Sequence, residues 1–512
     1  MSIRRLAGVH LAAIAAFGFG LLVYVPTLLP GVAFGDWAEM QTAPLLLEIP
    51  HPTGFPLYIL LGRLWLLVEP FGSVAWRMNL FAAVVVAGAA AVATVTAARL
   101  GARPVLALAG GMLLAATGTV WDAATAAEVN GLHLLLVSLL VFLAVRWRDE
   151  QRPRDILLGG LLAGLAVSNH LLALAADAVI VPLALWAGRR TLLQRPWLVP
   201  AAGALSLVGL APYLFIPIRV ALSAPIEYPA LRTLSGIWDH ITGVAYRRDM
   251  HVLSGDSVAN VIRDLPGLAA YAVAEVGGVG VIALILSVLG LATLVRRDPW
   301  SAALTVALLA ITLDLFVGYR GDLPHYLLAG WLVVAIWAAL GFEAIARTFE
   351  TRWAGARPRS VARSALFPVV PLALVVPLLA ALVNLPAHDR SADETAPRFV
   401  DTVLASLPAN AIVFTYWDAG EALHYAECVE HRRPDVDVIA PDDWVSFRPC
   451  TGMTADIALR SGRPLYALAY AGRGLGSIAG RFTATPVTEL AVPFGGLALD
   501  HETALLRLTP TS

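Results

Sequence analysis

The sequence contains no lysine, only two cysteines, and few charged residues of either sign. Asp, Glu, Lys and Arg together make up 14% of the 512 residues, well below the roughly 25% of a soluble domain. The formal net charge is -1, so the overall balance gives no reason to expect nucleic acid or an acidic partner. Hydrophobic residues make up 58% of the chain, and we therefore predict a membrane protein.

Long apolar runs supply the membrane spans. The run Leu6–Leu29 is too long for the core of a signal peptide, which has about 7 to 15 residues, and it predicts a retained anchor. A bilayer core of about 30 Å needs roughly 20 apolar residues per helix. Further spans are predicted over Met78–Leu100, Val105–Val120, Val129–Arg146, Trp197–Pro217, Leu268–Leu294, Trp300–Val317, Leu323–Ile345 and Ala365–Leu385.

Arginines orient these spans, because loops rich in positive charge stay in the cytoplasm. A self-consistent cytoplasmic set consists of the N-terminus and the basic loops that follow Arg99, Arg146, Arg189, Arg296 and Arg347. The segment Ile156–Trp186 then has both ends inside, so it must be a hairpin that turns near Ser168–His170. We predict about eleven transmembrane helices in the inner (plasma) membrane, with a cytoplasmic N-terminus.

This topology divides the chain into two domains. Residues 1–386 form a transmembrane domain with a first outer loop over 31–77 and a long outer loop over 219–264. Within the first loop, Phe55–Val68 is short for a span and predicts a helix that lies in the membrane interface. Residues 387–512 form an extracytoplasmic domain.

The extracytoplasmic domain reads as an α/β fold. The segments Ala411–Tyr416 and Asp435–Ala440 read as strands with a helix between them, which indicates a parallel βαβ unit. Ala396–Leu407 reads as a further helix. The two cysteines, Cys428 and Cys450, both fall here, on the side of the membrane where disulfides persist. They are either a disulfide or two free thiols.

The first outer loop carries the candidate chemistry. Asp36 and Glu39 in "GDWAE" fit a capping box at a helix N-terminus. Alternatively, Asp36 is a general base that takes the proton of an acceptor hydroxyl, an effect worth about 10²- to 10⁴-fold. His51 follows in "HPTGFPLY" and is a candidate binding residue, although a lone histidine is more often structural.

Positive charge on the outer side is the second candidate feature. The arginines concerned are Arg77, Arg219, Arg247, Arg248 and Arg320. Arginine binds phosphate through a planar fork of donors, so the group could hold a lipid phosphate; salt bridges and snorkelling anchors are the alternatives. At the hairpin turn, Asn169 and His170 are candidates because polar groups at membrane depth are costly. We find no set of residues with metal-binding spacing and predict no metal and no cofactor.

Several of these segments together resemble a known family. They are "GDWAEMQTAPLLLEIPHPTGFPLYILLGRLW", "APYLFIPIRVALSAPIEYP", "YRGDLPHY" and "LPANAIVFTYWDAGEALHYAECVEHRRPDVDVIAPDDW". The chain resembles the bacterial relatives of the transmembrane O-mannosyltransferases, within the GT-C glycosyltransferase superfamily. The resemblance implies a lipid-linked sugar donor on a polyprenyl phosphate.

The resemblance also implies roles for individual residues. Asp36 takes the position of the catalytic base, with Glu39 beside it, and His51 falls in an element in which Thr53 replaces the family's second proline. Residues implied to contact the donor phosphate, the acceptor or the central cavity are Asn169, His170, Arg219, Tyr246 and Arg247. The "YRGDLPHY" turn adds Arg320, Asp322 and His325.

The sequence therefore predicts an inverting, metal-independent glycosyltransferase. It would move a sugar, such as the hexose mannose, from a polyprenyl phosphate to a hydroxyl of a protein or glycan acceptor outside the cytoplasm, with membrane lipids around it. The alternative is a transporter or flippase of lipid-linked sugars, which predicts inverted repeats around a site at the bilayer midplane. No such repeat is visible in the sequence.

Overall fold

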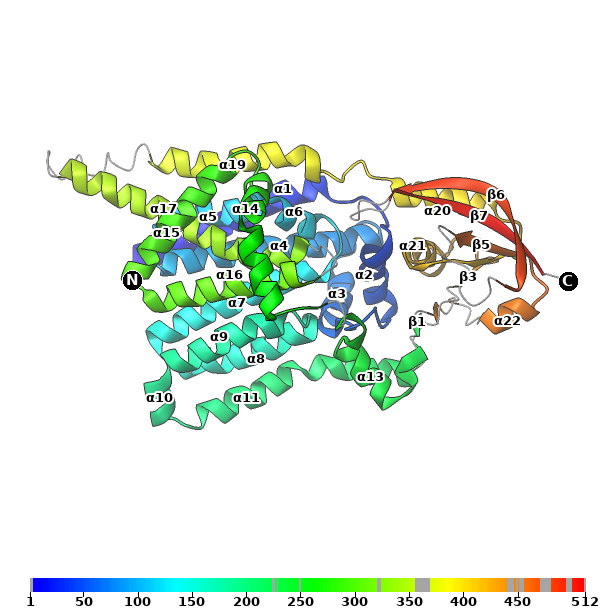
Figure 1. Ribbon diagram of the computed structural model, residues 1–512, viewed down its shortest axis with the longest axis horizontal. Coiled ribbons are helices and arrows are strands. Elements are labelled where there is room, and N and C mark those ends of the chain that lie inside the picture. Colours follow the sequence, from blue (N-terminus) through cyan, green and yellow to red (C-terminus); the bar gives the residue numbers. More distant parts are fainter. Residues whose placement is uncertain are drawn as a thin grey trace.

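A helical bundle and a small sheet domain lie end to end in the structure, which is a computed structural model (Figure 1). The bundle holds the N-terminus and the sheet domain holds the C-terminus. The structure describes residues 3–222, 226–227, 229–247, 250–319, 324–354, 369–439, 446–447, 450, 455–469, 480–493 and 500–510.

The bundle confirms a polytopic helical membrane protein. Among the described residues, eight helical segments are apolar and long enough to cross a membrane, or nine if one bent pair counts as a span. The figure of eleven stays a prediction. The eight segments are built on α1 (Ile3–Tyr24), α4 (Val74–Arg99), α7 (Val129–Glu150), α11 (Leu198–Gly209) with α12 (Phe215–Ala221), α15 (Gly280–Arg297), α16 (Pro299–Gly318), α17 (Leu328–Ala354) and α19 (Val369–His388).

The predicted hairpin is present as α8 (Pro153–Asn169) and α9 (Ala173–Ala187). The indole N–H of Trp147, at the end of α7, donates to the backbone oxygen of Ala184 near the end of α9, at 2.9 Å. Because α8 begins shortly after Trp147, the start of α8 and the end of α9 lie at the same end of the bundle. The turn between the arms falls after Asn169, where polar residues interrupt the apolar run.

Two predicted spans are wrong in detail. Instead of one straight helix over 105–120, the chain forms α5 (Pro104–Ala116) and α6 (Gly118–Thr125), which meet at 67°. The predicted span 268–294 is broken after α14 (Gly255–Glu275), and the apolar helix is α15. Gly277 and Gly278 between α14 and α15 both have positive φ, a conformation that glycine adopts without steric cost and that ends a helix.

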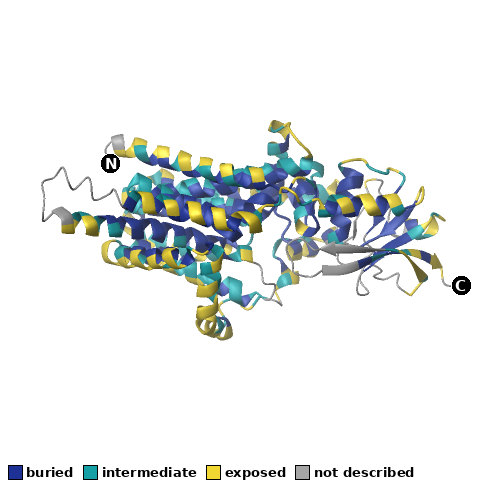
Figure 2. Cartoon of the chain, turned by 90° about the horizontal axis from the view of Figure 1, so that it is seen from above, coloured by how far each residue is buried: buried dark blue, intermediate teal, exposed yellow. Residues whose placement is uncertain are grey.

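Helices α4, α7 and α17 form the centre of the bundle. Between 67% and 83% of the residues in their apolar windows are buried, against about a fifth in α1 and in the segment from α11 to α12. Figure 2 shows the same pattern, with buried residues inside and exposed residues along the outer helices. Backbone N–H and C=O groups inside a bilayer must form hydrogen bonds within their own segment, so each apolar run forms a helix.

The arginines predicted to be cytoplasmic gather at the end of the bundle away from the sheet domain. Arg99 pairs with Glu150 at 2.7 Å, Arg103 with Glu350 at 2.6 Å, and Arg148 with Asp298. Gly8 near the N-terminus packs on Pro104, which places these pairs beside the start of α1. At this end of the bundle, the arginines thus pair with carboxylates of neighbouring helices.

The sheet domain contains the predicted parallel βαβ unit. Strands β2 (Ile412–Phe414) and β3 (Asp437–Ile439) pair in parallel, with α21 (Trp417–Cys428) between them in the chain. The five-stranded sheet has the order β3-β2-β5-β7-β6. The remaining elements are α20 (Thr395–Ser406), α22 (Ala455–Arg460), β5 (Leu465–Ala469), β6 (Phe482–Pro493), β7 (Asp500–Pro510), and a separate pair of short strands, β1 (Ile226–Glu227) and β4 (Ser446–Phe447).

Glycines let α8 and α11 approach closely. A side chain at Gly160 or Gly164 would collide with the backbone oxygen of Ala202 or Ser206 on α11, whereas one at Gly159 would meet nothing within 4 Å. Small residues permit such backbone contact in membrane helices, where van der Waals packing drives association.

We expect Gly164→Leu to destabilise the bundle by about 1–3 kcal/mol, because the new side chain must push α11 away from α8. The melting temperature of the purified protein in detergent measures this effect. Gly159→Leu makes the same chemical change where there is room and is the control. Equal melting temperatures for the two variants would contradict close packing of α8 on α11.

Candidate active site

The first outer loop folds back on itself around a buried carboxylate. It contains α2 (Gly35–Leu46) and α3 (Pro56–Val68), the second of which is the predicted short helix. The Glu39 side chain is fully buried, and it accepts the backbone N–H of His51 at 2.8 Å and contacts His51 Nδ1 at 2.5 Å. Asp36 lies one turn before Glu39, with Oδ1 at 3.9 Å from His51 Nδ1. Asp36, Glu39 and His51 therefore form one cluster.

The alternative of a capping box at Asp36 is wrong. The N-cap position of α2 is Phe34, and no side chain caps it. Asp36 lies inside the first turn of α2, with its side chain 57% exposed. The Glu39 carboxylate is taken by His51, so it does not reach back to the helix start. The Asp36 carboxylate therefore does not cap the helix and is exposed at the surface of the loop.

Electrostatics holds His51 in its charged form. Burial alone would lower the pKa of His51, but the charges of Glu39 and Asp36 raise it to about 9. The protonated ring then donates from Nδ1 to Glu39. This ion pair is stable because the carboxylate also accepts a backbone N–H, which compensates part of its desolvation.

A cavity of about 420 Å³ opens next to this cluster. It brings together six residues that the sequence singled out, namely Asp36, His51, His170, Tyr246, Arg247 and His325. They come from α2, the segment before α3, the hairpin turn, the long outer loop and the chain before α17. Segments far apart in the sequence thus build one site at the end of the bundle that faces the sheet domain.

Apolar residues also line the cavity. Leu174 and Ala175 on α9 and Leu315 on α16 are among them. Leu174 is 53% exposed, so the cavity reaches the outer surface of the bundle, where lipid chains would lie. A ligand with a charged head and a hydrocarbon tail fits a site of this composition.

Glu128 is a site residue that sequence reasoning missed. It lines the cavity, and its Oε1 accepts the backbone N–H of Val129 and the side-chain N–H of Asn130. Burial, followed by the charge of Asp36, raises the pKa of Glu128 to about 7. In the sequence, the position of Glu128 directly before an apolar run on the predicted outer side could have identified it as a candidate. Asp122, in the same loop, pairs instead with His388 and Arg390.

Other predicted residues lie outside this cavity. Arg219 donates to the backbone oxygens of Leu46 and Leu47 at the end of α2, at 3.2 and 2.5 Å, so it closes a helix end. Arg77 donates to the backbone oxygen of Leu66, and Asn169 is buried and donates to that of Val129 at 3.1 Å. Arg320 and Asp322 lie outside the described residues.

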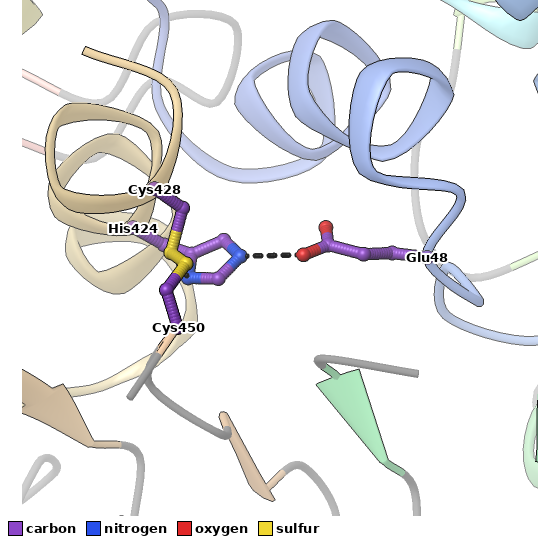
Figure 3. The surroundings of a disulfide bond; sticks show 4 residues. All are labelled: Glu48, His424, Cys428 and Cys450. Carbon is purple, nitrogen blue, oxygen red and sulfur yellow. Dashed lines mark hydrogen bonds and ion pairs between the residues drawn. A yellow bond between two sulfur atoms is a disulfide. The ribbon is translucent and has the colours of Figure 1, made fainter. Parts of the chain in front are cut away.

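The sheet domain contacts the first outer loop directly. The indole N–H of Trp417, at the start of α21, donates to Asp36 Oδ1 at 3.1 Å. His424 on α21 bonds Glu48 at 2.8 Å, and Cys428, one turn further on, forms a disulfide with Cys450 (Figure 3). The domain therefore forms part of the wall around the cluster.

Asp36, Glu39 and His51 also have the composition of a metal site. Each offers one ligand atom, and these atoms lie within 4.8 Å of one another. Metal binding requires a neutral imidazole, so a cation would have to displace the proton that the charges of Glu39 and Asp36 favour on His51.

The fold is shared with ArnT. Crystal structures of ArnT from Cupriavidus metallidurans, one of them bound to undecaprenyl phosphate, superpose over 97% of both chains, with 13% identity and TM-scores of 0.60 and 0.61. This likeness establishes the architecture of the whole chain.

Residues 36–192 match the family model described as the N-terminal domain of protein O-mannosyl-transferase TMEM260. Protein O-mannosyl-transferase TMEM260 of Mus musculus is 28% identical over 462 residues, which cover 85% of this chain and 63% of that protein. The Dictyostelium discoideum protein of that name is 22% identical over 479 residues, which cover 83% of this chain and 57% of its own length. The chain is thus similar to these O-mannosyl-transferases, and it spans about three fifths of their length.

The charged pair of His51 and Glu39 should make stability depend on pH. A histidine whose pKa is raised from its usual 6.5 to about 9 contributes stability fully below pH 6.5, and this contribution is lost as the pH rises through 9. The full contribution corresponds to roughly 3 kcal/mol.

Melting temperatures measured between pH 6.5 and 10 check this expectation. The decrease towards pH 10 should be smaller in His51→Gln than in the unmodified protein. His251→Gln, at an exposed histidine, is the control. If the pH dependence of His51→Gln matched that of the control, the pair would not be ionised as described.

Proposed function

We propose that the chain is an inverting glycosyltransferase that moves a hexose such as mannose from a polyprenyl phosphate to an acceptor hydroxyl on the extracytoplasmic side of the plasma membrane. The observation that supports this proposal most strongly is the cavity itself. Its lining combines the exposed carboxylate of Asp36 and the guanidinium of Arg247 with apolar side chains, among them the exposed Leu174. A sugar linked to polyprenyl phosphate likewise has a charged phosphate and an apolar lipid chain.

In this mechanism Asp36 accepts the proton of the acceptor hydroxyl. The hydroxyl oxygen then bonds to the anomeric carbon from the face opposite the phosphate. The bond from that carbon to the phosphate oxygen breaks, and the polyprenyl phosphate leaves with the electron pair. Phosphate leaves without being protonated, so one carboxylate base suffices, whereas glycoside hydrolases also need an acid for their leaving group.

Arg247 stabilises the departing phosphate. It is exposed and is the one arginine among the described residues that lines the cavity. A guanidinium keeps its charge at all physiological pH values and matches phosphate oxygens with paired donors. Fixed positive charge at the position where negative charge develops lowers the barrier more than it stabilises the bound donor.

Glu39 and His51 position the base in this scheme, and Glu128 is suited to a hydrogen bond with the sugar. Since its pKa is raised to about 7, Glu128 is partly protonated at neutral pH and can donate as well as accept. We propose that no metal takes part, since Arg247 supplies the positive charge for the leaving phosphate.

We expect Asp36→Asn to reduce turnover by 10²- to 10⁴-fold, the range for loss of a general base. The assay follows release of undecaprenyl phosphate from undecaprenyl-phosphate mannose in detergent, with a Ser/Thr-rich peptide as acceptor and EDTA present. Asp256→Asn, at an exposed aspartate on α14, removes the same charge away from the cavity. Full turnover by Asp36→Asn would exclude this residue as the base, and a requirement for divalent metal would contradict the metal-free scheme.

Arg247→Gln should lower turnover by about tenfold or more and raise the KM for the lipid donor, because a charge-assisted bond to phosphate is lost. Arg263→Gln, at a 70% exposed arginine outside the cavity lining, is the matched control. An unchanged KM together with unchanged turnover would place the phosphate elsewhere.

A further inference from the structure

One face of α21 lies against the acidic part of the first outer loop. Trp417, Glu421 and His424 follow one another at helical spacing and share that face. Trp417 contacts Asp36, and His424 contacts Glu48. Glu421 lies between them, fully buried, and its pKa is raised by burial and by the charges of Glu39 and Glu48.

His424 and Tyr425 fix the position of α21. His424 and Glu48 are both fully buried, and their bond is 2.8 Å long. His424 also touches Cys428 Sγ at 3.3 Å from its other ring nitrogen, next to the disulfide (Figure 3). The hydroxyl of Tyr425 accepts the backbone N–H of Ala75 at the start of α4, at 3.0 Å. The helix is thus attached both to the loop and to the bundle.

The backbone next to Asp36 shows the same close fit. Gly35 has a φ of +54°, and a Cβ at this position would lie 2.8 Å from Asp418 Oδ1. Only glycine combines that conformation with so close a neighbour. The first residues of α21 therefore pack directly on the first residues of α2.

Trp417 acts on one oxygen of Asp36. Its N–H donates to Oδ1, and the ring of His51, whose Nδ1 is nearest to the same oxygen, packs edge-on against Trp417 at 5.9 Å between centroids. Within the described part of the chain, no residue donates a hydrogen bond to Oδ2. One oxygen is thus held in place while the other remains available.

We propose that Trp417 is a positioning residue of the transfer reaction: its indole N–H holds Asp36 Oδ1, so that Oδ2 faces the cavity and accepts the proton of the acceptor. This inference rests on the proposed role of Asp36 as base. It makes the sheet domain part of the active site, since its docked helix completes the surroundings of the base.

The test measures the ionisation of Asp36 without any substrate. Water-soluble carbodiimide couples an amine to protonated carboxyl groups, and mass spectrometry of the full-length protein quantifies labelling at residue 36 as a function of pH. A hydrogen bond to a carboxylate favours its charged form. Trp417→Phe should therefore increase labelling at residue 36 at a given pH, and should lower turnover by about tenfold.

Trp197→Phe is the control, because Trp197 is 54% exposed and lies at the opposite end of the bundle, after α10 (Arg189–Gln194). If Trp417→Phe melts at a lower temperature than the control, benzothienylalanine at position 417 replaces it, since this residue keeps the bicyclic ring and lacks the N–H. Unchanged labelling of residue 36, or changed labelling with full turnover, would overturn the role of Trp417.

The two proposals fail in different ways. Full turnover by Asp36→Asn would remove the base itself, whatever position 417 does. Loss of turnover in Asp36→Asn together with unaltered behaviour of both position 417 variants would leave the base in place and exclude only Trp417.

Discussion

The buried bond between Glu39 and His51 is the interaction on which the site depends. An ionised carboxylate with no exposed surface is tolerated only when charged and polar donors satisfy it, and His51 provides both its ring and its backbone N–H. These two bonds tie the segment before α3 to α2 and so determine the path of the first outer loop. As a result, Asp36 lies at the surface of the cavity instead of at a helix cap. The same bond keeps His51 charged beside it.

The membrane explains why the site lies at one end of the bundle. Apolar helices cannot leave backbone groups unsatisfied within the bilayer, so the irregular chain and most polar side chains gather at the two ends. At one end, arginines pair with carboxylates between neighbouring helices. At the other end, carboxylates, histidines and Arg247 border a cavity that apolar side chains also line. The second end therefore combines ionisable groups with the apolar lining of this cavity.

Much of this arrangement could be predicted from the sequence because its causes are local. Apolar runs predicted nearly every membrane helix, the polar interruption after Asn169 predicted the hairpin, and alternating strand and helix patterns predicted the pairing of β2 with β3. The motif around Asp36 and His51 also identified the loop that carries the site. Strand β6 was not predicted, since its sequence has no clear hydrophobic alternation.

The remaining features depend on contacts between distant parts of the chain. No local pattern shows that Arg219 closes the end of α2 or that Glu128 faces the cavity. The bond from Trp417 to Asp36 joins residues at opposite ends of the sequence, and it exists only because the sheet domain docks on the bundle. Helix spacing placed Asp36 and Glu39 one turn apart, but which of them is buried depends on His51.

A structure determined with undecaprenyl-phosphate mannose bound tests the assignment of this cavity most directly. We expect the phosphate beside Arg247, the lipid chain along α9 and α16, and the anomeric carbon with space for an acceptor oxygen between it and Asp36 Oδ2. Reacting atoms in such complexes lie about 3–3.5 Å apart. A phosphate bound at the opposite end of the bundle, in the apolar groove beside Trp147 and Asp155, would contradict the assignment.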